Sequence, residues 1–98
     1  MLSEARVVTH RPAVYLQRLC QHFAMKTPAE YDEQRGSVQF AMGACELHVE
    51  PEALLLRVQA ADQASLAQVQ HIVGDHLERF GHHDRLKVDW TAAPTPVG

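Results

Sequence analysis

The middle of the chain alternates between apolar and polar residues with a period of two, and this pattern constrains the fold more than any other feature. The apolar positions form three successive runs: Val38, Phe40 and Met42; Cys45, Leu47 and Val49; and Leu54, Leu56 and Val58. Such alternation is typical of β-strands that bury one face. We therefore predict an antiparallel meander with one apolar face.

Short turn sequences between these runs predict how the strands pair. We expect two-residue hairpin loops at Gly43–Ala44 and Pro51–Glu52, and a third loop at Gln34–Arg35. The expected partners are Val38 with Val49, Phe40 with Leu47 and Met42 with Cys45; Val49 with Leu54, Leu47 with Leu56 and Cys45 with Val58; and Tyr31 with Val38 and Ala29 with Phe40. Each pair joins two apolar residues or residues of small size, while Glu46 faces Arg57 on the other face.

Two segments have helical periodicity. Apolar residues recur at helical spacing over Pro12–Met25 and over Gln63–Phe80. Pro12 is tolerated in a first helical turn, Asp62 is a good N-cap, and Gly81 is a typical stop. Shorter alternating stretches predict strands at Ala5–Thr9 and Leu86–Trp90.

These elements predict an α+β fold. The simplest packing is a two-layer sandwich, an antiparallel meander sheet with both helices packed on one face. The chain has 98 residues, the size of one domain. We expect this domain over residues 1–90 and a flexible C-terminal tail over residues 91–98, where little can be buried.

Composition excludes several classes of protein. The formal net charge is −3, which argues against binding to nucleic-acid phosphates. No apolar run approaches the roughly 18 residues of a membrane helix, and Met1–Arg11 lacks the apolar centre of a signal peptide. We expect a cytoplasmic protein with neither membrane nor nucleic-acid partner. Cys20 and Cys45 fall on apolar faces, so we expect reduced, buried thiols.

The chain contains seven histidines, and helical periodicity separates two of them from the rest. His76 falls within the apolar arc of the second helix, and His22 lies at the edge of that of the first, four residues before Lys26. If both helices cover the sheet, the two imidazoles converge. One interpretation is a small polar pocket with Lys26 at its rim, able to recognise an anion. The other is two hydrogen-bonded core histidines and a lysine that extends to solvent.

A second group of polar residues lies on the opposite face of the second helix. His71, Asp75, Glu78 and His82 follow one another at spacings of four, three and four residues. Imidazoles and carboxylates one turn apart can chelate zinc or another transition metal. Gly81 is expected to end the helix before His82, however, and Asp75 can instead pair with Arg79. We assign no metal site there.

Motifs on both helices resemble a known bacterial family. They are Tyr15-Leu16, Leu19-Cys20, His22-Phe23 and Lys26, followed by Gly36, Ala60–Asp62, His76–Phe80 and Trp90. Over roughly residues 5–90, the chain resembles the family catalogued as domain of unknown function 2218. The resemblance carries over His22, Phe23, Lys26, His76, Glu78, Arg79 and Phe80. It implies no established activity, but an association with siderophore-interacting ferric-reductase proteins. The Gly81–Asp84 stretch departs from the family pattern.

Three hypotheses for the function follow. The first is an accessory module that binds a small anionic ligand, in an iron- or siderophore-linked context, through His22, Lys26, His76 and Arg79. The second is a structural or interaction domain that forms a homodimer through the open sheet face, where Leu55 lies. The third, ranked last, is an enzyme that uses His76 as a general base. No nucleophile motif or glycine-rich phosphate loop is present, and the sequence identifies no cofactor.

Overall fold

The fold consists of two helices and six strands. A computed structural model describes residues 1–92 of the chain. In chain order the elements are β1 (Leu2–Val8), α1 (Pro12–Ala24), β2 (Ala29–Tyr31), β3 (Arg35–Phe40), β4 (Gly43–Glu50), β5 (Ala53–Ala60), α2 (Gln63–Phe80) and β6 (Thr91–Ala92). The predicted boundaries of α2 are confirmed, and α1 ends one residue earlier than predicted.

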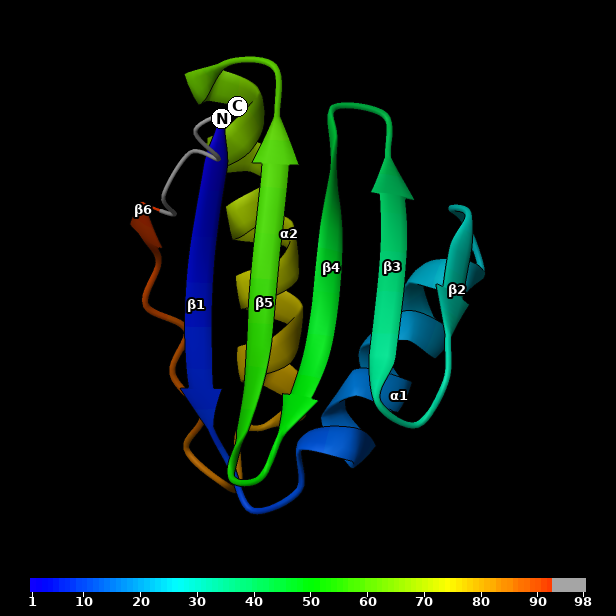
Figure 1. Cartoon of the computed structure of the whole chain (residues 1–98), viewed down its shortest axis with the longest axis vertical. Coiled ribbons are helices and arrows are strands. Elements are labelled where there is room, and N and C mark those ends of the chain that lie inside the picture. Colours follow the sequence, from blue (N-terminus) through cyan, green and yellow to red (C-terminus); the bar gives the residue numbers. More distant parts are fainter. Residues whose placement is uncertain (93–98) are drawn as a thin grey trace.

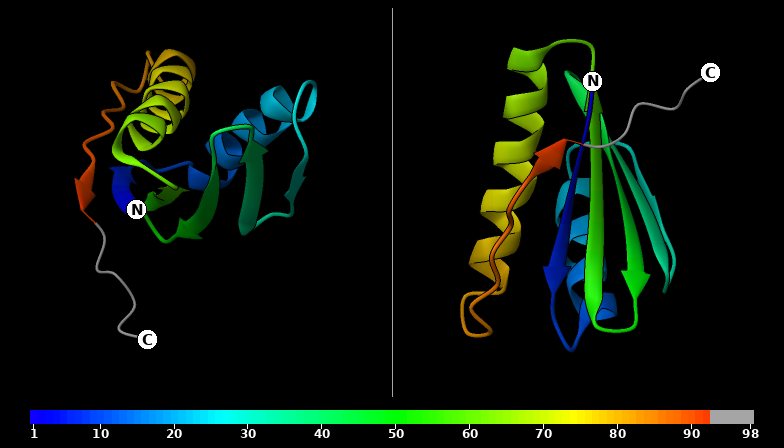
Figure 2. Two further views of the ribbon diagram at one scale, coloured as in Figure 1. Left: turned by 90° about the horizontal axis from the view of Figure 1, so that it is seen from above. Right: turned by 60° about the vertical axis from the view of Figure 1, so that its left-hand side comes forward.

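The strands form one antiparallel sheet in the order β2-β3-β4-β5-β1-β6. Both helices lie on the same face of this sheet, α2 behind β5 and β1 and α1 behind β3 and β2 (Figure 1). The view along the sheet shows the two layers, with the other face uncovered (Figure 2). The predicted α+β two-layer fold is therefore confirmed.

The pairing between neighbouring strands matches the predictions only in part. Between β4 and β5 the expected register is confirmed, with Leu47 opposite Leu56 and Glu46 opposite Arg57. Between β3 and β4 it was predicted wrongly, because Val38 lies opposite Cys45 rather than Val49. The same applies between β2 and β3, where Ala29 lies opposite Val38.

The register errors come from the positions of the turns. The β3–β4 turn lies at Ala41–Met42, and Gly43 is already the first residue of β4. Each error displaces the partner by an even number of residues, so every side chain keeps its face. The apolar face was therefore predicted correctly although the strand partners were not.

The chain ends differ from the prediction as well. Leu86–Trp90 form no strand; they run along α2, with Leu86 buried and Val88 and Trp90 packed against the core. Thr91 and Ala92, assigned to the tail, instead form β6 opposite Glu4 and Ser3. The rest of the expected tail lies outside the described residues.

The core fills the space between the helices and the sheet. Leu16 and Leu19 of α1 and Val69 and Leu77 of α2 are fully buried there. Asp62 caps α2 as predicted, since its carboxylate accepts a hydrogen bond of 2.7 Å from the Ser65 amide. No helix within residues 1–92 is long and apolar enough to cross a membrane.

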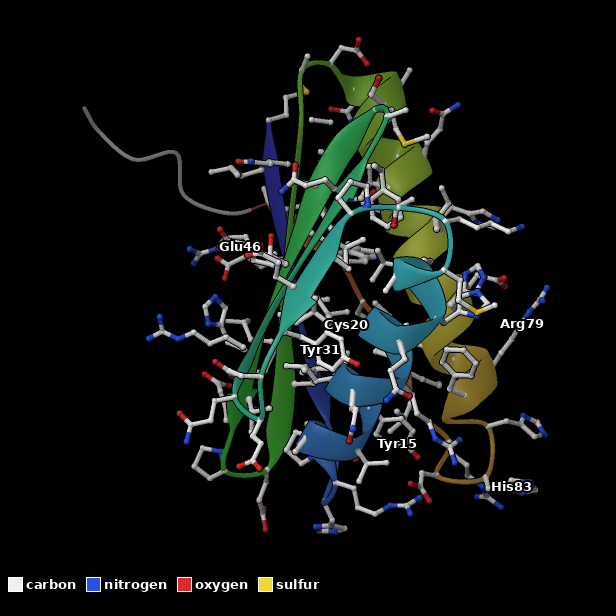
Figure 3. The ribbon with its side chains drawn as sticks, turned by 90° about the vertical axis from the view of Figure 1, so that its right-hand side faces the viewer. Tyr15, Cys20, Tyr31, Glu46, Arg79 and His83 are labelled. Atoms are coloured by element: carbon white, nitrogen blue, oxygen red, sulfur yellow. The ribbon has the colours of Figure 1, made fainter. Side chains whose placement is uncertain are left out.

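Both cysteines belong to this core, as predicted. Cys20 lies between α1 and the sheet (Figure 3), and Cys45 is buried on β4. Both are free thiols. Burial raises the pKa of Cys20 to about 11 and raises that of Cys45 further. Neither thiol is thereby suited to act as a nucleophile at neutral pH.

Candidate functional site

The two histidines that the periodicity singled out meet between the helices. His22 lies on the last turn of α1, and His76 lies near the C-terminal end of α2. Their ring centroids are 4.7 Å apart, and the ring planes are inclined by 42°. The predicted convergence of the two imidazoles is therefore confirmed.

Phenylalanine rings form the base of this histidine pair. The Phe23 ring packs against His76 at 5.1 Å between centroids, and the Phe80 ring packs against His22 at 5.6 Å. Phe23 also contacts Phe40 of β3 at 5.1 Å. The pair thus rests on an apolar support, while His22 itself is exposed and His76 is half-buried.

The hydrogen bonding of His76 fixes its tautomer. Its Nδ1 lies 2.7 Å from the carbonyl oxygen of Ile72, one turn earlier on α2. A carbonyl oxygen can only accept, so Nδ1 carries the proton and donates it. In the neutral ring, Nε2 then keeps its lone pair. This nitrogen can accept a proton or bind a metal ion.

The two cationic residues predicted for the site lie at its periphery. Lys26 follows α1 directly and is exposed. Arg79 is also exposed, and its Nε lies 3.2 Å from the Asp75 carboxylate on the same helix. Figure 3 shows Arg79 projecting away from the sheet, opposite Glu46 on the uncovered face. The four predicted residues therefore share a surface at the helix ends rather than an enclosed pocket.

The larger hollows of the molecule lie elsewhere. One of about 650 Å³ lies between α1 and the β2–β3 turn, lined by Val14, Tyr31 and Glu33 among others. Another of about 480 Å³ lies on the uncovered sheet face, beside Arg35, Glu46 and His48. Neither is lined by any of the four residues predicted to bind ligand.

The polar face of α2 is engaged in local contacts. Asp75 pairs with Arg79, as one interpretation of the sequence held, and Glu78 accepts a 3.0 Å hydrogen bond from the Val88 amide. His82 lies beyond the end of α2. Within residues 1–92, no three histidine, cysteine, aspartate or glutamate side chains gather closely enough to hold one metal ion.

The sequence gave no indication of a second polar cluster, at the opposite end of α1. Asp84, in the loop after α2, accepts hydrogen bonds from the Tyr15 hydroxyl and, at 2.8 Å, from Arg11. Arg11 also lies over the Tyr15 ring, at 5.6 Å from its centroid. Arg11 and Tyr15 are four residues apart on the chain, but Asp84 is distant, so only the tertiary structure reveals the cluster.

The ionisation of this cluster reflects its internal contacts. Hydrogen bonds from Tyr15 and Arg11 hold the pKa of Asp84 below its usual range. Burial and the hydrogen bond to Asp84 raise the pKa of the Tyr15 hydroxyl. At neutral pH the cluster is therefore a neutral tyrosine between a carboxylate and a guanidinium, a satisfied structural contact.

The uncovered sheet face is polar and laced with ion pairs. Arg6 pairs with Glu50 at 2.8 Å, and Arg57 pairs with Glu4 at 3.2 Å. His48 lies 3.7 Å from Glu46. Leu55, the apolar residue predicted on this face, is only half-exposed. The face therefore lacks the broad apolar patch typical of a stable dimer interface.

These features define a small two-layer α+β domain with an exposed histidine pair. The model of a bacterial family, described as "Uncharacterized protein conserved in bacteria (DUF2218)", matches residues 4–91. The chain therefore belongs to this family, as its helical motifs predicted.

A solved structure shares both the fold and much of the sequence. It is described as the NMR structure of PA4090 from Pseudomonas aeruginosa and is 34% identical to this chain. The similarity covers 96% of this chain and 98% of that one, with a TM-score of 0.79. Comparison with curated proteins found no match.

Proposed function

We propose that this protein is a small binding module, rather than an enzyme, that takes an anionic ligand at the surface formed by His22, Lys26 and His76. The observation that carries the proposal is the contact of the two imidazoles, 4.7 Å apart, between the ends of two helices. The ligand class is a small molecule with carboxylate, catecholate or hydroxamate oxygens, and its context is iron or siderophore handling beside a siderophore-interacting reductase.

The chemistry of these side chains supports an anionic ligand. Imidazole N–H groups and an ammonium group are hydrogen-bond donors, and charged donors form the stronger bonds to anionic oxygens. The phenylalanine rings beneath the pair offer apolar contact to the body of a ligand. An exposed shallow site suits a module that exchanges its ligand with a partner rather than one that encloses it.

Arg79 has a smaller part in the proposed site. Its guanidinium already pairs with Asp75, and its side chain is 74% exposed. A ligand would have to compete with that carboxylate, so Arg79 contributes long-range attraction more than direct contact. Replacing Arg79 is therefore expected to weaken binding less than replacing His22 or Lys26.

Calorimetric titration tests the proposal. The probes are a ferric catecholate, a ferric hydroxamate, their metal-free fragments, and inorganic phosphate as a simple anion. We expect at least one to bind, and binding to weaken in His22→Gln and Lys26→Gln. His71→Gln and Lys87→Gln, at exposed positions elsewhere, are the matched controls. Absence of heat with all probes, or equal affinity in all variants, contradicts the proposal.

The homodimer interpretation has less support. The uncovered sheet face carries the ion pairs Arg6–Glu50 and Arg57–Glu4, and burying such pairs in an interface has a desolvation penalty. It stays a prediction, and sedimentation at high protein concentration tests it.

A further inference from the structure

We infer that His22 and His76, together with the Met25 thioether, form a binding site for a soft or borderline transition-metal ion, copper(I) in particular. This inference goes beyond the proposed anion site, since it uses imidazole lone pairs and a sulfur atom rather than cationic donors. It rests on the tautomer of His76, the separation of the two rings and the position of Met25.

The hydrogen bond of His76 gives that ring the arrangement of a metal ligand. Histidines that bind metals almost always donate the other ring N–H to a carbonyl or carboxylate, which orients the ring and fixes the tautomer. His76 does so through Nδ1, 2.7 Å from the Ile72 carbonyl. Its Nε2 lone pair is therefore the one available to an ion.

The separation of the rings matches two imidazoles on one ion. With a metal–nitrogen bond of about 2.0 Å, each ring centroid lies about 3 Å from the ion, and a tetrahedral angle puts the centroids about 5 Å apart. The centroids of His22 and His76 are 4.7 Å apart. Because His22 is exposed, its ring can turn to direct a nitrogen to the ion while His76 stays fixed.

Met25 supplies the soft ligand. It is the C-cap of α1 and keeps right-handed helical geometry, with φ −67° and ψ −24°, so it lies three residues after His22 on the same side of the helix. Its side chain is 81% exposed and takes no part in the core. Thioether and imidazole together select copper(I) over the hard ions that prefer oxygen.

The charges around the pair do not prevent binding. Lys26, on α1, is exposed, and its long side chain can direct its ammonium group to solvent. On α2, the guanidinium of Arg79 is balanced by Asp75 at 3.2 Å. Within residues 1–92 no carboxylate joins a cluster of three such ligands, so solvent or a small ligand completes the coordination.

Competition with a chromophoric copper(I) chelator in deoxygenated buffer tests the inference. The wild-type chain is expected to remove one equivalent of copper(I) from the chelator. His22→Gln is expected to weaken binding by at least about tenfold, the scale on which metal sites respond to their surrounding residues. Met25→Leu is expected to weaken it as well, while retaining the affinity for zinc(II), which does not need sulfur.

The exposed pair His82–His83 provides the control, because its rings are also close, with centroids 5.8 Å apart. The double variant His82→Gln/His83→Gln is expected to retain copper binding. Unchanged affinity in His22→Gln, or loss of binding in the double variant, would overturn the inference. Circular dichroism of each variant confirms that the fold persists, and all three sites are exposed, so unfolding does not confuse the result.

Discussion

The two ends of α1 carry polar clusters of opposite character. At its start, Tyr15 is 2% exposed and its hydroxyl is bonded to Asp84, whose carboxylate also binds Arg11. At its end, His22 and His76 contact each other, and the ring hydrogen bond given for the pair is that of His76 to a backbone carbonyl. The first cluster is closed and satisfied, whereas the second retains ring nitrogens that can bind.

The difference teaches how to separate a structural polar contact from a candidate site. A buried polar group must find a partner, and once it has one it holds the fold together. The Tyr15 cluster pins the loop after α2 to the first turn of α1. The histidine pair is more exposed than its role in packing requires, which leaves it free to contact a ligand.

Removing the Tyr15 side chain should have the greatest consequence. Tyr15→Ala is expected to lower the free energy of unfolding by about 3–5 kcal/mol, as for other buried aromatic side chains. Tyr31→Ala is the matched control, since Tyr31 is 39% exposed. Urea denaturation gives both values. Equal losses in the two variants would mean that Tyr15 has no special place in the fold.

Removing only the hydroxyl isolates the polar contact. Tyr15→Phe is expected to lower the free energy of unfolding by about 1.5–3 kcal/mol, the range for hydrogen bonds to charged groups. Tyr31→Phe should leave it nearly unchanged, because no hydrogen bond from the Tyr31 hydroxyl is found among the described residues. A neutral Tyr15→Phe would show that the hydroxyl contributes nothing.

The pH dependence of stability should report on Asp84. Its pKa is lower in the folded protein, so its contribution is fully present above the unfolded value of about 3.9 and is lost as the pH falls through the folded value. Asp84→Asn should therefore be less stable than wild type at pH 7, and the gap should close in acid. Chemical denaturation across this range checks it; a gap that widens in acid would have the wrong sign.

The histidine pair should respond least in stability. His22→Ala is expected to change the free energy of unfolding by less than about 0.5 kcal/mol, since the residue is exposed. The same variant should lose ligand affinity, in contrast to the Tyr15 variants. Thermal unfolding and calorimetric titration on the same samples separate the two effects. A large loss of stability would place His22 with the structural cluster.

The sequence predicted what depends on periodicity and left out what depends on tertiary contacts. Period two placed Val38 and Leu47 on the buried face, and helical periodicity brought His22 and His76 together. The turn at Ala41–Met42 escaped prediction, because Gly43–Ala44 is an equally plausible hairpin sequence. The strand expected at Leu86–Trp90 failed because its apolar residues pack on α2 instead of the sheet.

The candidate site divides in the same way. Helical spacing placed His76 inward, but it could not show that Ile72 fixes its tautomer. It could not reveal the Tyr15–Asp84 contact either, since these residues lie far apart in the chain and no periodic pattern joins them. The exposure of Arg79 follows from its pairing with Asp75, which the sequence offered only as an alternative for that carboxylate.

The most direct test of the account follows the histidine ring signals by NMR at constant pH while a ferric siderophore fragment or inorganic phosphate is added. The chain has seven histidines, so the other five serve as internal controls. We predict saturable shifts confined to His22 and His76, with the Tyr15 ring signals unchanged. Shifts spread equally over His71, His82 and His83, or no shift at the pair, would contradict the claim that the exposed end of α1 is the binding site.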